Sequence, residues 1–168
     1  MPFTPFHFGV GLAMKSVLLR RFHLGFFIAL QVVIDLESLY NLVQHRYPVH
    51  RFLHTFVGAT LLAVASSALV LPMVIWWRGT QENAAVSSPG RIFASLLATA
   101  LFATWSHVVL DGIMHKDAQP FWPISAANPM LRLIGVGPLH LACVALGLLG
   151  GYVLALRIAM TDDRIASP

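Results

Sequence analysis

The feature that most constrains the fold is an unbroken apolar run from residue 52 to residue 77. His54 is the only ionisable side chain in this run, which is longer than the roughly 20 residues that an α-helix needs to cross a bilayer. Two further runs, 92–110 and 138–156, each carry a single histidine near one end. All three runs predict membrane-spanning helices.

Two other segments carry a weaker form of this signal. Residues 22–44 are long enough to cross, but they contain Asp35 and Glu37, and a carboxylate at bilayer depth costs on the order of 3 kcal/mol. The segment 5–19 is short for a full crossing, and Thr4 as N-cap with Pro5 at the first helical position predicts where its helix starts.

We therefore expect an all-α integral membrane bundle with four to five transmembrane helices, built as a single domain. The segments between the apolar runs are short, except for a proline- and aromatic-rich stretch that we expect to lie as a loop at the membrane surface. The predicted elements are helices at about 5–19, 22–44, 52–77, 92–110 and 138–156, a membrane-surface loop at 111–137, and a polar tail at 161–168.

Composition agrees with a membrane setting. The 168 residues are 57% hydrophobic and 11% charged, whereas soluble domains carry about 25% charged residues. The net charge of +4 could indicate nucleic-acid binding, but the basic residues stand singly or in pairs at the ends of apolar runs, as membrane flanks do. We expect membrane lipids as partners and no nucleic acid.

Cys143, the only cysteine, cannot form an internal disulfide.

Alternate crossing of five helices places nearly all histidines and carboxylates of the bundle on one side. We call the side on which the first helix starts side A; helices two and four end there, and helices three and five begin there. His23 is the only histidine that falls on the opposite side, side B. The residues on side A are His7, Asp35, Glu37, His50, His54, His107, Asp111 and His140, with His45 and His115 in adjoining turns.

The spacing of these residues along the chain indicates which side chains can point at the same place. Residues four apart lie on one helical face, so the pairs His50/His54 and His107/Asp111 can each direct two side chains at one point, with His115 a turn further on. Asp35 and Glu37 are two apart, about 200° around a regular helix, so both cannot face the same centre. Two polar stripes result: Gln31, Asp35 and Ser38 on one, and Glu37, Asn41 and Gln44 on the other.

Imidazole and carboxylate groups without cysteine are ligands for first-row ions such as zinc, manganese or iron. We expect a divalent cation, with zinc as the leading candidate. We interpret His23, His45 and His140 as interfacial or hydrogen-bonded residues, with His140 as a reserve ligand. The predicted ligands are His7, Asp35, His54, His107 and Asp111, followed by Glu37, His50 and His115.

Several motifs occur in a distinctive order: an N-terminal TPFH, an acidic D-x-E near a helix end, HRFLHT opening the next helix, and SHVVLD followed by QPFWP. Together they resemble the membrane-bound metal-dependent hydrolase family typified by the inner membrane protein YdjM. The resemblance implies a hydrolase of bacterial cytoplasmic membranes whose metal is bound by the motif residues, here His7, Asp35, His54, His107 and Asp111. The chain departs from the family pattern at Ile34, at Glu37 and in HRFLHT, which is one residue shorter before its second histidine.

The expected function is hydrolysis of an amphiphilic substrate, such as a lipid-like ester or phosphoester, by a metal-activated water. Glu37 or Asp35 is the expected general base. Two alternatives stay open: a binding or scaffold protein whose metal only stabilises the bundle, and a metal transporter, against which the apolar side B halves of the last three helices argue. Basic residues are more numerous on side B, so the positive-inside rule predicts that side A faces outward.

Overall fold

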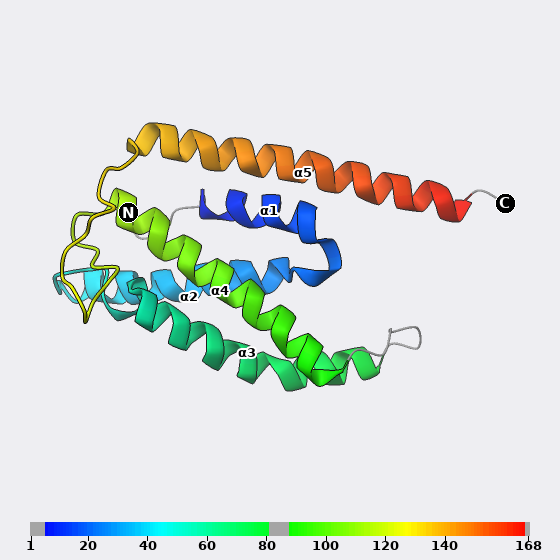
Figure 1. The fold of residues 1–168 in the computed structure, drawn as a ribbon, viewed down its shortest axis with the longest axis horizontal. Helices are drawn as coiled ribbons and strands as arrows, with labels where there is room; N and C mark the ends of the chain where they lie inside the picture. The colour runs from blue at the N-terminus through cyan, green and yellow to red at the C-terminus, as the bar shows by residue number, and fades with distance from the viewer. Residues whose placement is uncertain (1–5, 81–87, 167–168) are drawn as a thin grey trace.

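The computed structural model describes residues 6–80 and 88–166, and in these ranges every regular element is helical. The elements follow one another as an up-and-down bundle, and side A is the end at which the long loop between α4 and α5 lies (Figure 1). In chain order they are α1 His7–Leu18, the 3₁₀ turn η1 Leu19–Arg21, α2 Leu24–Val43, the 3₁₀ turn η2 Phe52–His54, α3 Phe56–Gly79, α4 Pro89–Met114 and α5 Val136–Ala166.

In the part of the chain that the structure describes, four helices are long and apolar enough to cross a membrane, which confirms the prediction of an all-α bundle with four to five spans. These are α2, α3, α4 and the part of α5 from Val136 to Met160. The first helix has 12 residues, which correspond to about 18 Å of helix against a hydrocarbon core about 30 Å thick. The predicted cap residues Thr4 and Pro5 lie outside the described residues.

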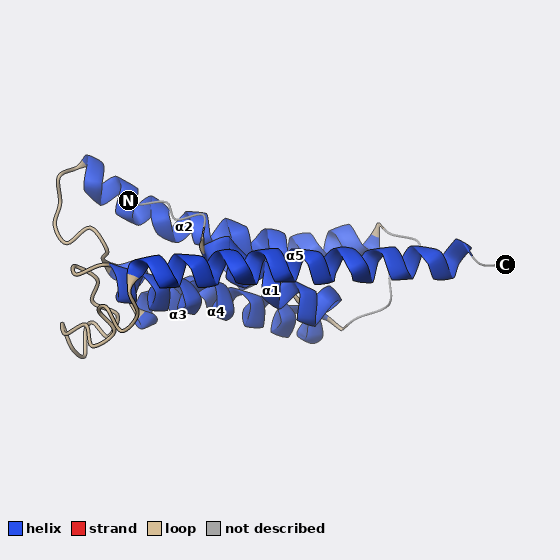
Figure 2. Ribbon diagram, turned by 90° about the horizontal axis from the view of Figure 1, so that it is seen from above, coloured by secondary structure: helices blue, strands red, loops and turns tan. Residues whose placement is uncertain are grey.

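Helix α1 nevertheless runs within the bundle, side by side with α5 and in contact with α2 and α4 (Figures 1 and 2). Glycine makes this contact close, because a Cβ atom added at Gly150 would lie 2.6 Å from the Cα atom of Ala13, and one at Gly9 would overlap the carbonyl of Cys143. Small residues at such points let helix backbones approach in membranes. The packing carries His7, the first residue of α1, into the interior.

The start of α3 differs from the prediction. The side chain of Thr55 accepts a hydrogen bond from the backbone N–H of Gly58 at 3.0 Å, so Thr55 is the N-cap and the helix begins at Phe56. Residues 52–54 form a 3₁₀ turn instead of the first helical turn. The expected helical stacking of His50 on His54 is therefore wrong, although their rings still meet with centroids 4.8 Å apart.

Two helices extend beyond their apolar runs. Helix α4 continues to Met114, so Asp111 lies in its last turn and the loop begins at 115 and not at 111. The backbone of α5 is helical as far as Ala166, into the segment expected to be a polar tail. The end of α4 is supported by the loop, since Asn128 donates side-chain hydrogen bonds to the carbonyls of Gly112 and His115 at 2.8 and 3.2 Å. These contacts satisfy carbonyls that a helix end leaves free.

The interior of the bundle changes character along its axis. Toward side B it is mainly apolar, with a cluster of Phe22, Phe27, Leu30, Ala63, Ala100 and Ala103; buried hydroxyls there, such as those of Ser16 and Thr99, donate to helix carbonyls. Toward side A it contains the buried histidines and carboxylates described below. Many large apolar side chains, such as Leu69 and Leu148, point outward, and an apolar outer surface around a partly polar interior is the arrangement expected of a membrane protein.

Candidate metal centre

Asp111 lies at the middle of the polar cluster, with 3% of its side chain exposed. It shares one face of α4 with His107, one turn before it, and His115, which caps the helix one turn after it. The Nε2 atom of His107 lies 3.2 Å from Asp111 Oδ2, and that of His115 lies 3.7 Å from Oδ1. The predicted spacing along α4 therefore directs both imidazoles at a single carboxylate.

Helix α2 contributes Asp35 and Gln31, whose stripe faces inward. Asp35 Oδ1 lies 3.4 Å from His107 Nε2. On the other side of the His107 ring, Nδ1 donates a short hydrogen bond to Gln31 Oε1, and the Gln31 amide donates to the carbonyl of Ala103 at 3.2 Å. Because Nδ1 carries this proton, the lone pair of the neutral ring lies on Nε2, the atom that faces the carboxylates.

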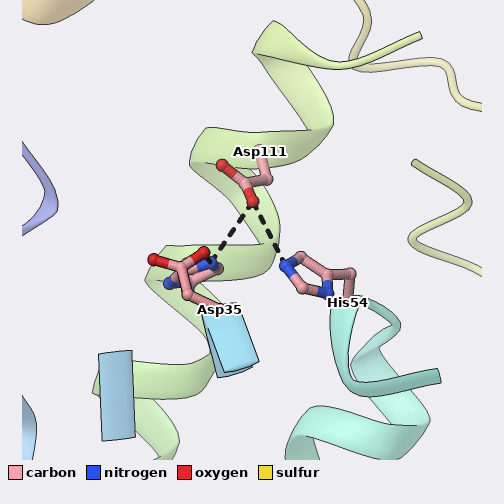
Figure 3. A group of neighbouring side chains, drawn as sticks. Asp35, His54 and Asp111 are labelled. Carbon is pink, nitrogen blue, oxygen red and sulfur yellow. Dashed lines mark ion pairs between the residues drawn. The ribbon is translucent and has the colours of Figure 1, made fainter. Parts of the chain in front are cut away.

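His54 approaches from the turn before α3. Its Nε2 lies 3.3 Å from Asp111 Oδ2 (Figure 3) and 3.2 Å from the hydroxyl of Ser38. Its Nδ1 donates to Glu37 Oε2 at 3.3 Å, and the same oxygen accepts from the backbone N–H of Leu53 at 2.9 Å. Glu37 therefore lies behind the imidazole and holds it, whereas Asp35 faces the centre. This agrees with the expectation that the two carboxylates cannot point at one place.

His50 completes the arrangement from the segment between α2 and η2. Its Nε2 lies 3.7 Å from Asp111 Oδ2, and its Nδ1 donates to Asp117 Oδ1 at 3.0 Å. Asp117 Oδ2 also accepts from the backbone N–H groups of Val49 and His50, at 2.8 and 3.2 Å. Burial opposes ionisation of Asp117, but His50 and these backbone donors outweigh it and lower the pKa of the carboxyl group.

Sequence reasoning missed Asp117 as a partner of His50. The only available signal was an acidic residue two positions after His115, and nothing in the spacing relates it to His50, which lies on another segment.

Burial lowers the pKa of His50 and also that of His115. Both rings are therefore neutral near pH 7, which is the form that binds metal ions.

A common pattern connects these histidines. In each ring Nδ1 donates to a side-chain oxygen, which leaves Nε2 directed toward Asp111. Metal-binding histidines are held in this way by oxygen atoms on their second nitrogen, which set the tautomer and the ring orientation. The pairs of donating ring and accepting side chain are His107 with Gln31, His54 with Glu37, and His50 with Asp117.

His7 reaches the same place from α1. Its Nε2 lies 3.5 Å from Asp111 Oδ1, and its ring meets that of His107 edge-on with centroids 4.5 Å apart. Both of its nitrogens, together with His107 Nε2 and Asp111 Oδ1, are buried without a well-directed hydrogen bond. Buried polar atoms without partners cost about 1–3 kcal/mol each, and a cation among them would satisfy several at once.

The donors fit a first-row divalent cation. One ligand atom from each of Asp35, His54, His107 and Asp111 lies within 4.8 Å of the others, and all four residues are buried. Two imidazoles and two carboxylates without a thiolate suit zinc, manganese or iron. His7 stands beside this group and does not belong to it by mutual distance, while Glu37 contacts it only through His54.

The histidines interpreted as interfacial or hydrogen-bonded lie apart from these donors. The ring of His140 stacks on Phe6 with centroids 4.2 Å apart, and His45 is exposed in the turn that ends α2. On side B, His23 pairs with the hydroxyl of Ser95 at 3.0 Å. Cys143 is buried in an apolar cluster with Leu110, Ile113 and Leu139.

No protein-family model, curated protein sequence or solved structure matches this chain. The chemistry of the centre is therefore inferred from the residues that form it.

Proposed function

We propose that this protein is a membrane-embedded, metal-dependent hydrolase with a divalent cation, zinc first among the candidates, at Asp35, His54, His107 and Asp111. The observation that carries the proposal is the convergence of these four ligating atoms within 4.8 Å, at a buried position. A cation held there would supply Lewis acidity and would lower the pKa of a water molecule near it, as catalytic metal ions do.

Hollows at the side A edge of the centre favour catalysis over a purely structural role, because a substrate must be able to approach a catalytic ion, whereas structural metal sites are closed. A hollow of about 350 Å³ is lined by His50, Phe52, Thr55 and Trp122 among others. A second hollow, of about 510 Å³, is lined by His115, Asp117 and Leu131 among others. Histidines that face the carboxylate centre thus also face the surface.

The lining of the hollows favours an amphiphilic phosphoester as substrate. Arg51 lines the first hollow, and Lys116 and Arg132 line the second, so cationic groups stand around both. Phe52 and Trp122 form an apolar wall of the first, with ring centroids 6.4 Å apart. A phosphate group would pair with the cations, and an acyl or prenyl chain would lie against the aromatic rings and the apolar outer surface.

In the proposed reaction the oxygen of a water molecule forms a bond to phosphorus, and the bond from phosphorus to the leaving oxygen breaks. The proton lost by the water ends on that leaving oxygen. Asp35 is the carboxylate besides Asp111 that faces the centre, so it is the group placed to accept the proton first. Glu37 Oε2 accepts hydrogen bonds from the backbone N–H of Leu53 and from His54 Nδ1, so the role of Glu37 is to position His54.

Transport of the ion is the weaker alternative. A permeation path needs polar groups through the full depth of the membrane, but the core toward side B contains a cluster of Phe22, Phe27 and Leu30 with small alanines. Buried hydroxyls there, such as those of Ser16 and Thr99, are already bonded to helix carbonyls. A metal-stabilised scaffold shares the ligand set of a catalytic site and is separated from it by the experiment below.

The resemblance to the YdjM-type hydrolase family supports the proposal, since the four matched residues other than Asp111 each contact Asp111 or a residue that contacts it. We propose membership in that family and a place in the bacterial cytoplasmic membrane. The excess of basic residues on side B supports an outward-facing centre.

The deciding experiment is purification of the full chain in detergent, measurement of bound metal, and a screen of ester and phosphoester lipids for turnover. Asp111→Ala and His54→Ala should lose both metal and turnover, and His45→Ala, in an exposed turn, should keep both. A parent protein without stoichiometric metal would refute the proposal. Bound metal without turnover on either substrate class would assign the protein to the scaffold class instead.

A further inference from the structure

We infer that the centre holds a second divalent cation, bound by His50, His115 and Asp111, so that Asp111 bridges two ions. This inference rests on the proposed function for its first ion. The ligating atoms of the three residues lie within 4.8 Å of one another and form a group separate from that of Asp35, His54 and His107. Asp111 is the one member that the two groups share.

Asp111 Oδ2 faces histidines of both groups, whereas Oδ1 faces His115 and, at 3.5 Å, His7 Nε2. Oδ2 lies 3.2 Å from His107 Nε2 and 3.3 Å from His54 Nε2, which belong to the first group. Oδ1 lies 3.7 Å from His115 Nε2, and Oδ2 is again 3.7 Å from His50 Nε2. Separations of 3.7 Å are too long for hydrogen bonds, yet they are short enough for an ion to lie among the three atoms.

The donors of the second group are also prepared for ligation. Oδ1 of Asp111 is buried and accepts no hydrogen bond, so it needs a partner that the described residues do not supply. The rings of His50 and His115 are stacked, with centroids 4.1 Å apart and planes within 23°, and each presents Nε2 to Asp111. Asp117 fixes His50 through Nδ1 at 3.0 Å, which is the carboxylate–histidine arrangement typical of metal sites.

The second group differs from the first in its access to solvent. The side chains of His54 and His107 are fully buried, whereas that of His115 is 21% exposed. His50 lines one hollow of side A and His115 lines the other. The second ion would therefore face an incoming substrate, with the first ion behind it. Paired cations that share a ligand are typical of enzymes that cleave phosphoesters, because two charges stabilise the attacking and leaving oxygens.

The test uses the full chain in detergent, stripped with a chelator, reloaded with Zn²⁺ and freed of excess metal, with metal per chain measured by mass spectrometry. We expect two ions per chain in the parent and in His45→Ala, and one in His115→Ala. His115→Asn, which keeps a polar side chain, should also retain one. Loading with Mn²⁺ should give an exchange-coupled electron paramagnetic resonance spectrum in the parent and an uncoupled six-line spectrum in His115→Ala.

The outcomes separate the two proposals. A parent that binds one ion, with no change in His115→Ala, overturns the second site and leaves the proposed function intact. A parent that binds none overturns both. Loss of all metal in His115→Ala and also in His115→Asn would mean that the residues form one site and not two. An uncoupled Mn²⁺ spectrum in a parent protein that holds two ions would overturn the inference as well, because ions bridged by Asp111 would be coupled.

Discussion

Replacement of Glu37 distinguishes a residue that positions His54 from one that takes a proton during catalysis. Glu37 Oε2 accepts two hydrogen bonds, from the backbone N–H of Leu53 at 2.9 Å and from His54 Nδ1 at 3.3 Å. Glu37→Ala removes both, which frees the imidazole to rotate and to change tautomer. Glu37→Gln keeps a carbonyl oxygen at the same place and removes only the charge.

The expected magnitude follows from these contacts. A hydrogen bond to a charged group contributes about 1.5–3 kcal/mol, and loss of an outer oxygen partner of a metal-binding histidine weakens metal affinity roughly 10–100-fold. The two figures agree, because tenfold corresponds to about 1.4 kcal/mol. We expect Glu37→Ala to weaken Zn²⁺ binding by about 10–100-fold on this ground. Glu37→Gln should weaken it by less than about tenfold, since its geometry is kept.

The assay is competition for Zn²⁺ between the purified protein and a chromophoric chelator, with turnover measured on the same samples. Gln44→Ala, at the exposed end of α2, serves as the control and should leave the affinity unchanged. The reasoning is refuted if both Glu37 variants bind Zn²⁺ like the parent while Glu37→Gln loses turnover, because that pattern belongs to a general base and not to a positioning residue.

Three further predictions follow from the fold. Gly150→Ala should lower the thermal midpoint, at a cost of roughly 1–3 kcal/mol for overpacking against α1, whereas Gly25→Ala, with open space around it, should not. Chelation of the bound metal should lower the midpoint of the parent, because the unfolded chain lacks the assembled ligands; an equal midpoint with and without metal would contradict this. Burial, followed by the charges of Arg78 and Lys15, lowers the pKa of His23. The unfolded chain therefore binds a proton at His23 at a higher pH than the folded chain does. The free energy of unfolding falls as pH drops below about 6.5, and it falls less steeply in His23→Gln than in the parent.

The membrane helices could be predicted because their signal is local. An apolar run of sufficient length must satisfy its backbone within itself, so it is helical whatever its neighbours are. The helix ends are set by other contacts: Thr55 delays the start of α3, and the loop contact of Asn128 supports α4 past the apolar run. The close packing of α1 against α5 likewise depends on the fit of Gly150 against Ala13.

The gathering of His7, Asp35, His54, His107 and Asp111 at one end followed from alternation of the helices, which needs only the order and length of the apolar runs. Alternation did not predict which of these residues faces the centre and which residues hold the others in place. The sequence placed Asp35 and Glu37 on different faces of α2, but which carboxylate faces the centre depends on how α2 is rotated against α3 and α4. The packed bundle turns Asp35 inward and leaves Glu37 behind His54.

By itself the sequence predicted a membrane setting and the four long apolar helices, since each depends on the composition of one segment, and it predicted the end at which the ionisable groups collect from the order of those segments. Only the tertiary structure decided that Asp117 holds His50, that Gln31 holds His107, and that Asp111 belongs to both groups of potential ligands. These pairings join residues distant in the chain. They depend on the path of the loop after α4 and on the rotation of each helix, which no local periodicity encodes.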